Sequence, residues 1–316
     1  MGMIRKTVAL CVLSILFSIS FPLRTNGEAS ISSLTFYKTN DCLFSYAEKQ
    51  QVLYYSIQEK VPLIGINRYS VYSYAHGRSS RIFTTANEIL SICATENKLY
   101  YISADSYTHR GRLYCIDMGT KKQAMLLDET YGCGSILNIS HDQVYVSTES
   151  GIFIMGVDGS CLRELCSKQY YVENCTSSGI TYYDEQAWYF RSWEDIDCPI
   201  KVLENEKGYV GNDRVVAYSR SQYIVFNSLT GDLRFYGDDV CTLFSNVLSV
   251  MYHHDQLQIL QKAEENRRFI IIDIESHVPH QMVYEIRLPI NSAFYMISDK
   301  LYYVEQSSLK SIILTD

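Results

Sequence analysis

The chain has 316 residues and a formal net charge of −7 at pH 7, with 28 Lys and Arg against 35 Asp and Glu. The first 27 residues contain three of the cations (Arg5, Lys6 and Arg24) and no acid, so the remaining residues carry −10. This acidic balance argues against a nucleic-acid partner, which needs a basic surface. It is compatible with cationic or neutral partners.

Residues 1–27 have the pattern of a secretory signal peptide. Arg5 and Lys6 give a basic start, residues 8–21 are an apolar run, and residues 25–27 (Thr-Asn-Gly) are small enough for a signal peptidase. The leader looks bacterial, so we predict a protein that is secreted or associated with the cell envelope. An uncleaved anchor is the alternative, because the apolar run is near the lower length limit for a membrane span. Membrane contact is expected only in that case.

One short segment recurs along the rest of the chain. Its clearest copy is Lys98–Ser103, an apolar run rich in aromatic residues that is typical of a buried strand. Successive copies lie 34 to 46 residues apart, and a period of about 35–45 residues with several short strands per unit is typical of propeller blades. The seven copies are anchored on Leu53, Leu99, Val144, Ala187, Tyr223, Leu257 and Leu301.

We therefore predict an all-β fold, a seven-bladed β-propeller spanning residues 31–316. The last three strands, between residues 293 and 314, leave the seventh blade one strand short, while the strand Leu34–Tyr37 precedes the first blade and is left over. We predict that Leu34–Tyr37 completes the seventh blade and closes the ring, which pairs an open edge. Blade four runs from Gly179 to Val202 with a weak fourth strand, and blade five is also weak, so six or eight blades stay open as alternatives.

Two segments in the second and third blades carry a family resemblance. Lys98-Leu-Tyr-Tyr-Ile-Ser-Ala-Asp105, followed by Gly111-Arg-Leu-Tyr-Cys-Ile-Asp117, resembles the YWTD repeat of receptor propellers, and Val157-Asp-Gly-Ser160 resembles its "LDGS"-type turn. The chain is similar to exported bacterial propellers of the lipoprotein-receptor type. The resemblance covers most of the mature chain, but Tyr replaces the Trp of YWTD, and most copies lack the Asp. It implies a fold and carries no function.

In propellers, ligands usually bind the face formed by the loops between strands two and three of each blade and by the loops between blades. Residues 106–110, 193–197 and 264–268 are predicted to be such loops. Two aromatic residues in them offer flat apolar area, and their charged residues offer directional hydrogen bonds. A solvated loop without a ligand is the alternative. The predicted ligand-binding residues are Tyr107, His109, Arg110, Trp193, Glu194 and Asp195.

No recognisable set of nucleophile and base, and no dinucleotide or phosphate-binding fingerprint, occurs in the sequence. We therefore favour an exported, non-catalytic propeller that binds a protein or glycan, without a cofactor. The alternative is a propeller enzyme acting on polysaccharide, a lyase or a glycoside hydrolase, that uses acids such as Glu194, Asp195 and Asp197.

Nine cysteines follow the leader. Cys161 and Cys166 are close enough in sequence to form a disulfide. Cys175 and Cys198 flank the inner strands of one blade and could pair too, but the sequence does not fix the connectivity. A metal site is not expected, because the sequence contains no CxxC and no HxxxH pattern.

Overall fold

The structure of the protein is a computed structural model that describes residues 43–314, apart from residues 61–66, 106, 141, 168–170, 176–178, 184–186, 194, 205–212, 220–221, 228, 237–239, 254–255, 263–266, 274–280, 287–293 and 306–307. In this part of the chain all regular elements are β-strands, which confirms the predicted all-β class. The predicted signal peptide and the strand Leu34–Tyr37 lie outside the described residues, so both stay predictions. No helix within the described ranges is long and apolar enough to span a membrane.

The described strands belong to two compact units. The terminal unit combines residues 43–167 with residues 294–314, and the central unit comprises residues 171–286. Each is described by itself below.

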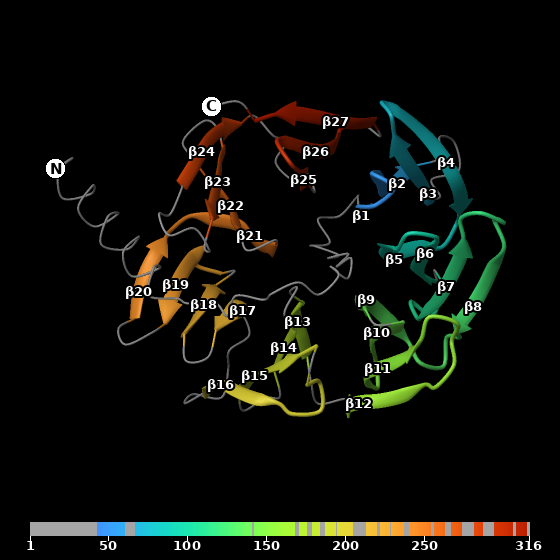
Figure 1. Cartoon of the computed structure of the whole chain (residues 1–316), viewed down its shortest axis with the longest axis horizontal. Helices are drawn as coiled ribbons and strands as arrows, with labels where there is room; N and C mark the ends of the chain where they lie inside the picture. Colours follow the sequence, from blue (N-terminus) through green and yellow to red (C-terminus); the bar gives the residue numbers. More distant parts are fainter. Residues whose placement is uncertain are drawn as a thin grey trace. The chain divides into compact units, whose positions relative to one another are not determined.

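The terminal unit contains four antiparallel sheets, in each of which consecutive strands are neighbours. In Figure 1 they are coloured from blue to yellow-green and, for the last sheet, red. The first sheet is β1 (Phe44–Ala47), β2 (Val52–Lys60), β3 (Asn67–Ala75) and β4 (Arg78–Thr85). The second is β5 (Glu88–Ala94), β6 (Lys98–Ala104), β7 (Gly111–Asp117) and β8 (Gln123–Leu127). The third is β9 (Cys133–Ser140), β10 (Gln143–Thr148), β11 (Gly151–Gly156) and β12 (Arg163–Ser167), and the three-stranded last sheet is β25 (Phe294–Ile297), β26 (Lys300–Glu305) and β27 (Ser308–Ile313).

The central unit contains three further four-stranded sheets of the same kind. The first is β13 (Tyr171–Cys175), β14 (Gly179–Tyr183), β15 (Ala187–Ser192) and β16 (Ile200–Glu204). The next is β17 (Asp213–Ser219), β18 (Gln222–Asn227), β19 (Asp232–Tyr236) and β20 (Val240–Phe244). The last is β21 (Val247–His253), β22 (Gln256–Lys262), β23 (Arg267–Asp273) and β24 (Gln281–Ile286).

The recurring segment forms the second strand in six of these seven sheets, as predicted, but not in the sheet β13–β16. There the segment is β15, the third strand, because β13 precedes the strand predicted to be first. The register supports this assignment. A β-bulge interrupts the first strand of five sheets, and in β13 it falls between Val172 and Asn174. The corresponding shifts occur in β5, β9, β17 and β21, so β13 is the structural equivalent of a first strand.

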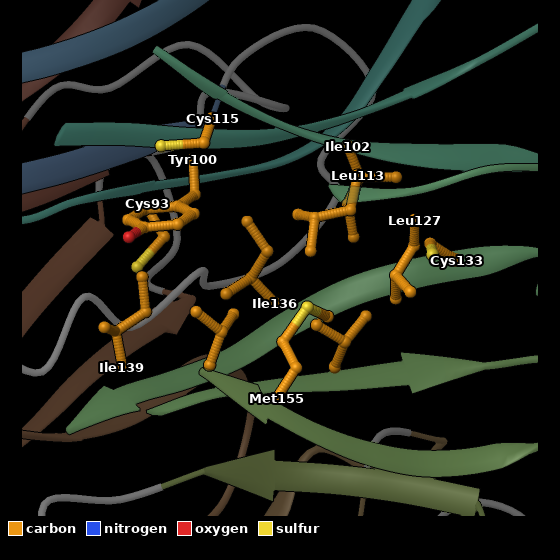
Figure 2. Packing of buried hydrophobic residues seen from close by; sticks show 12 residues of the cluster. Cys93, Tyr100, Ile102, Leu113, Cys115, Leu127, Cys133, Ile136, Ile139 and Met155 are labelled. Carbon is orange, nitrogen blue, oxygen red and sulfur yellow. The ribbon is translucent and has the colours of Figure 1, made fainter. Parts of the chain in front are cut away.

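Apolar side chains pack between neighbouring sheets and form the core. Figure 2 shows the cluster between the second and third sheets, where Tyr100, Leu113 and Met155 are almost wholly buried. A second cluster joins the first and second sheets. A third joins the last sheet to the first: the rings of Tyr295 in β25 and Phe44 in β1 have centroids 6.2 Å apart. The first and last sheets therefore lie side by side within the terminal unit (Figure 1).

Buried serines link successive first strands. Ser45 of β1 is fully buried, and its Oγ accepts a hydrogen bond from the backbone N–H of Ala94 in β5 (2.8 Å). Ser91 of β5 repeats this contact with the N–H of Ile136 in β9 (3.1 Å). These hydroxyls satisfy backbone donors that are buried between sheets, where an unpaired N–H is costly.

Candidate ligand surface

The predicted site residues lie in two loops of different type. Tyr107, His109 and Arg110 are in the loop between β6 and β7, the second and third strands of their sheet. Trp193 and Asp195 are in the loop between β15 and β16, which are the third and fourth strands of theirs. Residues 193–197 therefore neither join second and third strands nor connect two sheets, so the loop type predicted for them is wrong. The two loops belong to different units.

Two other predicted positions fall outside the description of the structure. Glu194 is not among the described residues, and neither are residues 264–266 of the third predicted loop, residues 264–268. Their places in a ligand site stay predictions.

Hydrogen bonds fix the backbone of the β6–β7 loop. The Oδ1 atom of Asp105 accepts from the backbone N–H of Tyr107 (2.8 Å) and of Thr108 (3.2 Å). The N–H of His109 donates to the carbonyl of Asp105 (2.9 Å), and the N–H of Arg110 donates to Oγ1 of Thr108 (3.3 Å). His109 has a φ of 54°, which turns the chain back toward β7. These bonds give the loop a defined conformation.

Tyr107 projects from this loop into solvent. Its side chain is 95 % exposed, more than any other large hydrophobic residue among the described residues. Apolar area held by a hydrogen-bonded loop loses little conformational entropy when it binds a partner. Tyr107 is therefore the best-presented apolar contact on this side of the sheet.

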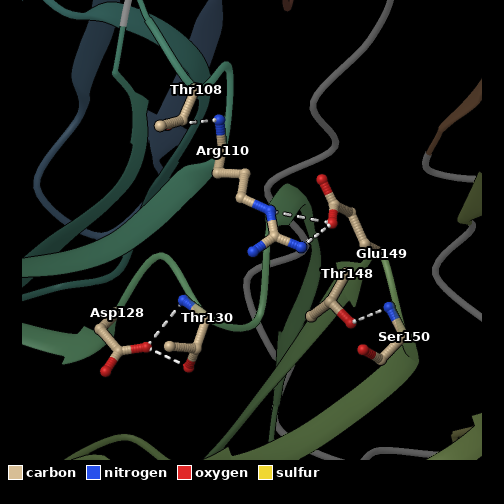
Figure 3. A network of polar contacts seen from close by, with 7 residues as sticks. All are labelled: Thr108, Arg110, Asp128, Thr130, Thr148, Glu149 and Ser150. Carbon is tan, nitrogen blue, oxygen red and sulfur yellow. Dashed lines mark hydrogen bonds and ion pairs between the residues drawn. The ribbon is translucent and has the colours of Figure 1, made fainter.

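Two ion pairs connect this loop and the start of β7 to neighbouring loops. Nε and Nη2 of Arg110 both donate to Oε2 of Glu149, at 3.1 and 2.6 Å, and Figure 3 shows the guanidinium reaching the β10–β11 loop. Arg112 of β7 pairs with Glu129 in the β8–β9 loop. The N–H of Glu149 in turn donates to the carbonyl of Gly132 at 3.0 Å. These contacts link three loops of the terminal unit.

A glycine fits closely where two of these loops meet. Gly132 has a φ of +59°, and a Cβ atom at this position would lie 2.5 Å from Cδ of Glu149. A larger residue would strain the backbone and displace the carboxylate that holds Arg110.

We define the loop surface as Asp105, Tyr107, Arg110, Arg112, Asp128, Glu129 and Glu149. Its charged groups interact with one another. Backbone N–H groups of Tyr107 and Thr108 lower the pKa of Asp105, and the hydroxyl and N–H of Thr130 lower the pKa of Asp128 (Figure 3). Arg112 adds a smaller lowering to both carboxyls. The hydrogen bonds to their carboxylates raise the pKa of Arg110 and Arg112. Four carboxylates and two guanidinium groups leave a net charge of −2.

Sequence reasoning missed five of these residues, Asp105, Arg112, Asp128, Glu129 and Glu149. A signal for the last three was present. Residues 128–132 lie between two blades, and Glu149 directly follows a second strand, both positions where propeller loops are expected to meet ligands. Their charged side chains could have been chosen by the same rule as Arg110.

The loop of residues 193–198 is built differently. The side chain of Trp193 is only 9 % exposed, so it offers little of the flat surface that was predicted for it. Arg191 fixes the loop by donating from Nε to the hydroxyl of Tyr182 (2.9 Å) and from Nη1 to the carbonyl of Ile196 (2.8 Å). Asp195 is exposed, and a hydrogen bond from Cys198 to its carboxylate raises the pKa of that thiol.

Cys161 and Cys198 are free, exposed thiols, so neither suggested disulfide is present. Burial raises the pKa of Cys133 to about 12 and keeps that thiol protonated at neutral pH. Within the described residues no group of three or more His, Cys, Asp or Glu side chains could hold a metal ion.

The sequence matches no protein-family model and no curated protein. Solved structures are similar to it. The β-propeller domain of the Trilobed protease from Pyrococcus furiosus, which has an open velcro topology, is 12 % identical over 92 % of this chain and 97 % of that chain, with a TM-score of 0.55. Acylaminoacyl peptidase from Pyrococcus horikoshii is 10 % identical over 90 % of this chain, with a TM-score of 0.56.

The chain spans 52 % of the length of that peptidase. A nidogen/laminin complex also matches, at 9 % identity over 74 % of this chain and 94 % of that chain. Its TM-score of 0.42 is too low to indicate a shared fold. At 12 % and 10 % identity, the two similar structures with the higher TM-scores indicate a common fold and no more. The chain has a β-propeller fold.

Proposed function

We propose that this protein is an exported, non-catalytic, seven-bladed propeller that binds a protein or glycan ligand at the loop surface. The observation that carries the proposal is Tyr107, an almost fully exposed aromatic residue on a loop whose backbone is fixed by hydrogen bonds. Ion pairs link this loop and the start of β7 to charged residues of two neighbouring loops. An exposed aromatic with nearby polar groups is the usual composition of a recognition surface.

The seven sheets of the described residues support a count of seven blades, and repeated contacts support ring closure. Tyr100 in the second sheet donates to the carbonyl of Val157, at the end of the third strand of the next sheet (3.1 Å). Tyr302 occupies the same position of the recurring segment in the last sheet. Its ring meets Tyr74, in the third strand of the first sheet, with centroids 5.8 Å apart. The last sheet thus contacts the first as the second contacts the third.

The length of the chain before β1 also suits closure by Leu34–Tyr37. The connections from β4 to β5 and from β8 to β9 use residues 86–87 and 128–132. Residues 38–43 would give a connection of similar length between Leu34–Tyr37 and β1. Pairing of that strand with β27 would give the last sheet four strands like the others. A ring without this strand, an open velcro arrangement, is the alternative.

The charges of the loop surface favour binding over catalysis. A general acid needs a pKa near the working pH, whereas hydrogen bonds lower the pKa of Asp105 and Asp128. Both arginines are already paired with carboxylates. The proposal includes a bacterial protein that is secreted or at the cell envelope, which the leader and the YWTD-like resemblance support. It includes no nucleic-acid partner, because the mature chain is acidic, and no cofactor.

The test is a pair of glycan and peptide arrays probed with the mature chain and with Tyr107→Ala. Leu229→Ala is the matched control, because Leu229 is also highly exposed, at 77 %, but lies in the central unit. We expect a set of spots that Tyr107→Ala loses and Leu229→Ala keeps. Equal signals for all three proteins would contradict the proposed surface. Release of glycan fragments from bound spots, seen by mass spectrometry, would establish the enzyme alternative.

A further inference from the structure

The charges of the loop surface are not equally available to a partner. Arg110 donates two hydrogen bonds to Glu149, and Arg112 is held by Glu129. An anionic ligand would have to compete with these carboxylates for either guanidinium group. Asp105 and Asp128 accept hydrogen bonds from neutral donors, the N–H groups and a hydroxyl of their own loops, and Arg112 acts on both carboxylates more weakly, through its charge. The charge left for a partner is therefore negative.

The exposed ring of Tyr107 suits the same kind of partner. The face of an aromatic ring attracts ammonium and guanidinium groups electrostatically. Tyr107 follows Asp105 by two residues, and its N–H bonds to that carboxylate, so ring and carboxylate belong to one fixed turn. A cationic side chain that meets the ring finds a carboxylate on the same loop.

We propose that the loop surface binds a lysine- or arginine-rich segment of a protein, with one cationic side chain over Tyr107 and others paired with Asp105 and Asp128. The inference rests on the proposed function and narrows its ligand from protein or glycan to a cationic peptide segment. Glu129 and Glu149 offset the positive charge of the two arginines with which they pair. Lowered pKa values keep Asp105 and Asp128 ionised well into the acidic range.

The probe is a fluorescein-labelled peptide of alternating Lys and Gly, titrated with the mature full-length chain and followed by fluorescence anisotropy. Exposed cation–π contacts are worth a few tenths to one kcal/mol, so Tyr107→Ala should weaken binding by roughly two- to five-fold. Tyr107→Phe keeps the ring and should bind like the wild type. Asp128→Asn should weaken binding, and added salt should weaken it further.

Asp158→Asn is the matched control. Asp158 forms the same turn, with its carboxylate bonded to the N–H of Ser160 at 2.9 Å, but it lies in the β11–β12 turn, at the other end of the strands. An equal loss for Asp158→Asn and Asp128→Asn would show charge attraction without a site and overturn the inference. So would equal binding of an alternating Glu and Gly peptide, or no effect of Tyr107→Ala.

The same titration distinguishes a failure of the cationic partner from a failure of the proposed function. A neutral oligosaccharide that binds in a Tyr107-dependent manner, while the Lys and Gly peptide does not, would overturn the cationic partner and leave the proposed function standing. If neither probe nor any array spot depends on Tyr107, both fail.

Discussion

The substitution Ser45→Ala tests how neighbouring sheets are joined. Ser45 is fully buried, and its Oγ is the acceptor for the backbone N–H of Ala94, 2.8 Å away. Alanine removes the acceptor and leaves that N–H buried without a partner. Such a loss costs about 1–3 kcal/mol. The small gain from no longer burying the serine hydroxyl does not offset it. We expect the free energy of unfolding to fall by about this amount.

Urea unfolding followed by tyrosine fluorescence measures the effect. With an m-value of about 2 kcal/mol per molar urea, the midpoint should fall by roughly 0.5–1.5 M. Ser311→Ala, on the exposed face of β27, is the control and should change stability by less than about 0.5 kcal/mol. A Ser45→Ala midpoint equal to that of the control would refute the role given to the buried serine.

Three further predictions concern the central unit and the acidic turns. Asp195→Asn removes the carboxylate that raises the pKa of Cys198, so iodoacetamide should label Cys198 faster, and labelling of Cys161, followed by mass spectrometry in the same sample, should not change. Trp193→Ala should lower the free energy of unfolding by about 3 kcal/mol, because the ring is buried; a urea midpoint equal to that of wild type would show that the ring contributes no packing. Hydrogen bonds lower the pKa of four turn carboxyls below their usual 3.8. The stability that these carboxyls contribute is therefore complete above about pH 4 and is lost as the pH falls through their folded-state pKa values. The urea midpoint should be lower at about pH 3 than at about pH 5, and an equal midpoint would contradict this prediction. These carboxyls belong to Asp105, Asp117, Asp128 and Asp158.

Much of the fold could be predicted because the same kind of strand is buried in every sheet. The copies of the recurring segment are apolar and recur every 34 to 46 residues, and this pattern predicted six of the seven second strands. The strand β13 was missed because Tyr171–Cys175 contains Glu173 and Asn174 and has no apolar alternation. One missed strand changed the order within its sheet, and residues 193–197 were therefore assigned to the wrong loop type.

The ligand surface was only partly predictable for a related reason. The loop of Tyr107 could be recognised from its place after a second strand and from its mixture of aromatic and charged residues. The pairing of Arg110 in this loop with Glu149 depends on how the next sheet packs, which no local pattern encodes. The hydrogen bonds from Arg191 to Tyr182 and Ile196, which fix the loop of Trp193, are likewise not encoded by any local pattern.

The most direct test of the central claim is to locate the bound ligand. The photo-crosslinking residue p-benzoylphenylalanine is placed at position 107 in one protein and at position 229 in another, and each is irradiated with the strongest ligand from the arrays. Both positions are highly exposed in the wild type, so they give equal chances of random capture. We predict a crosslinked product from position 107 and none above background from position 229. Equal yields from both positions, or a product from position 229 alone, would contradict the assignment of the ligand to the loop surface.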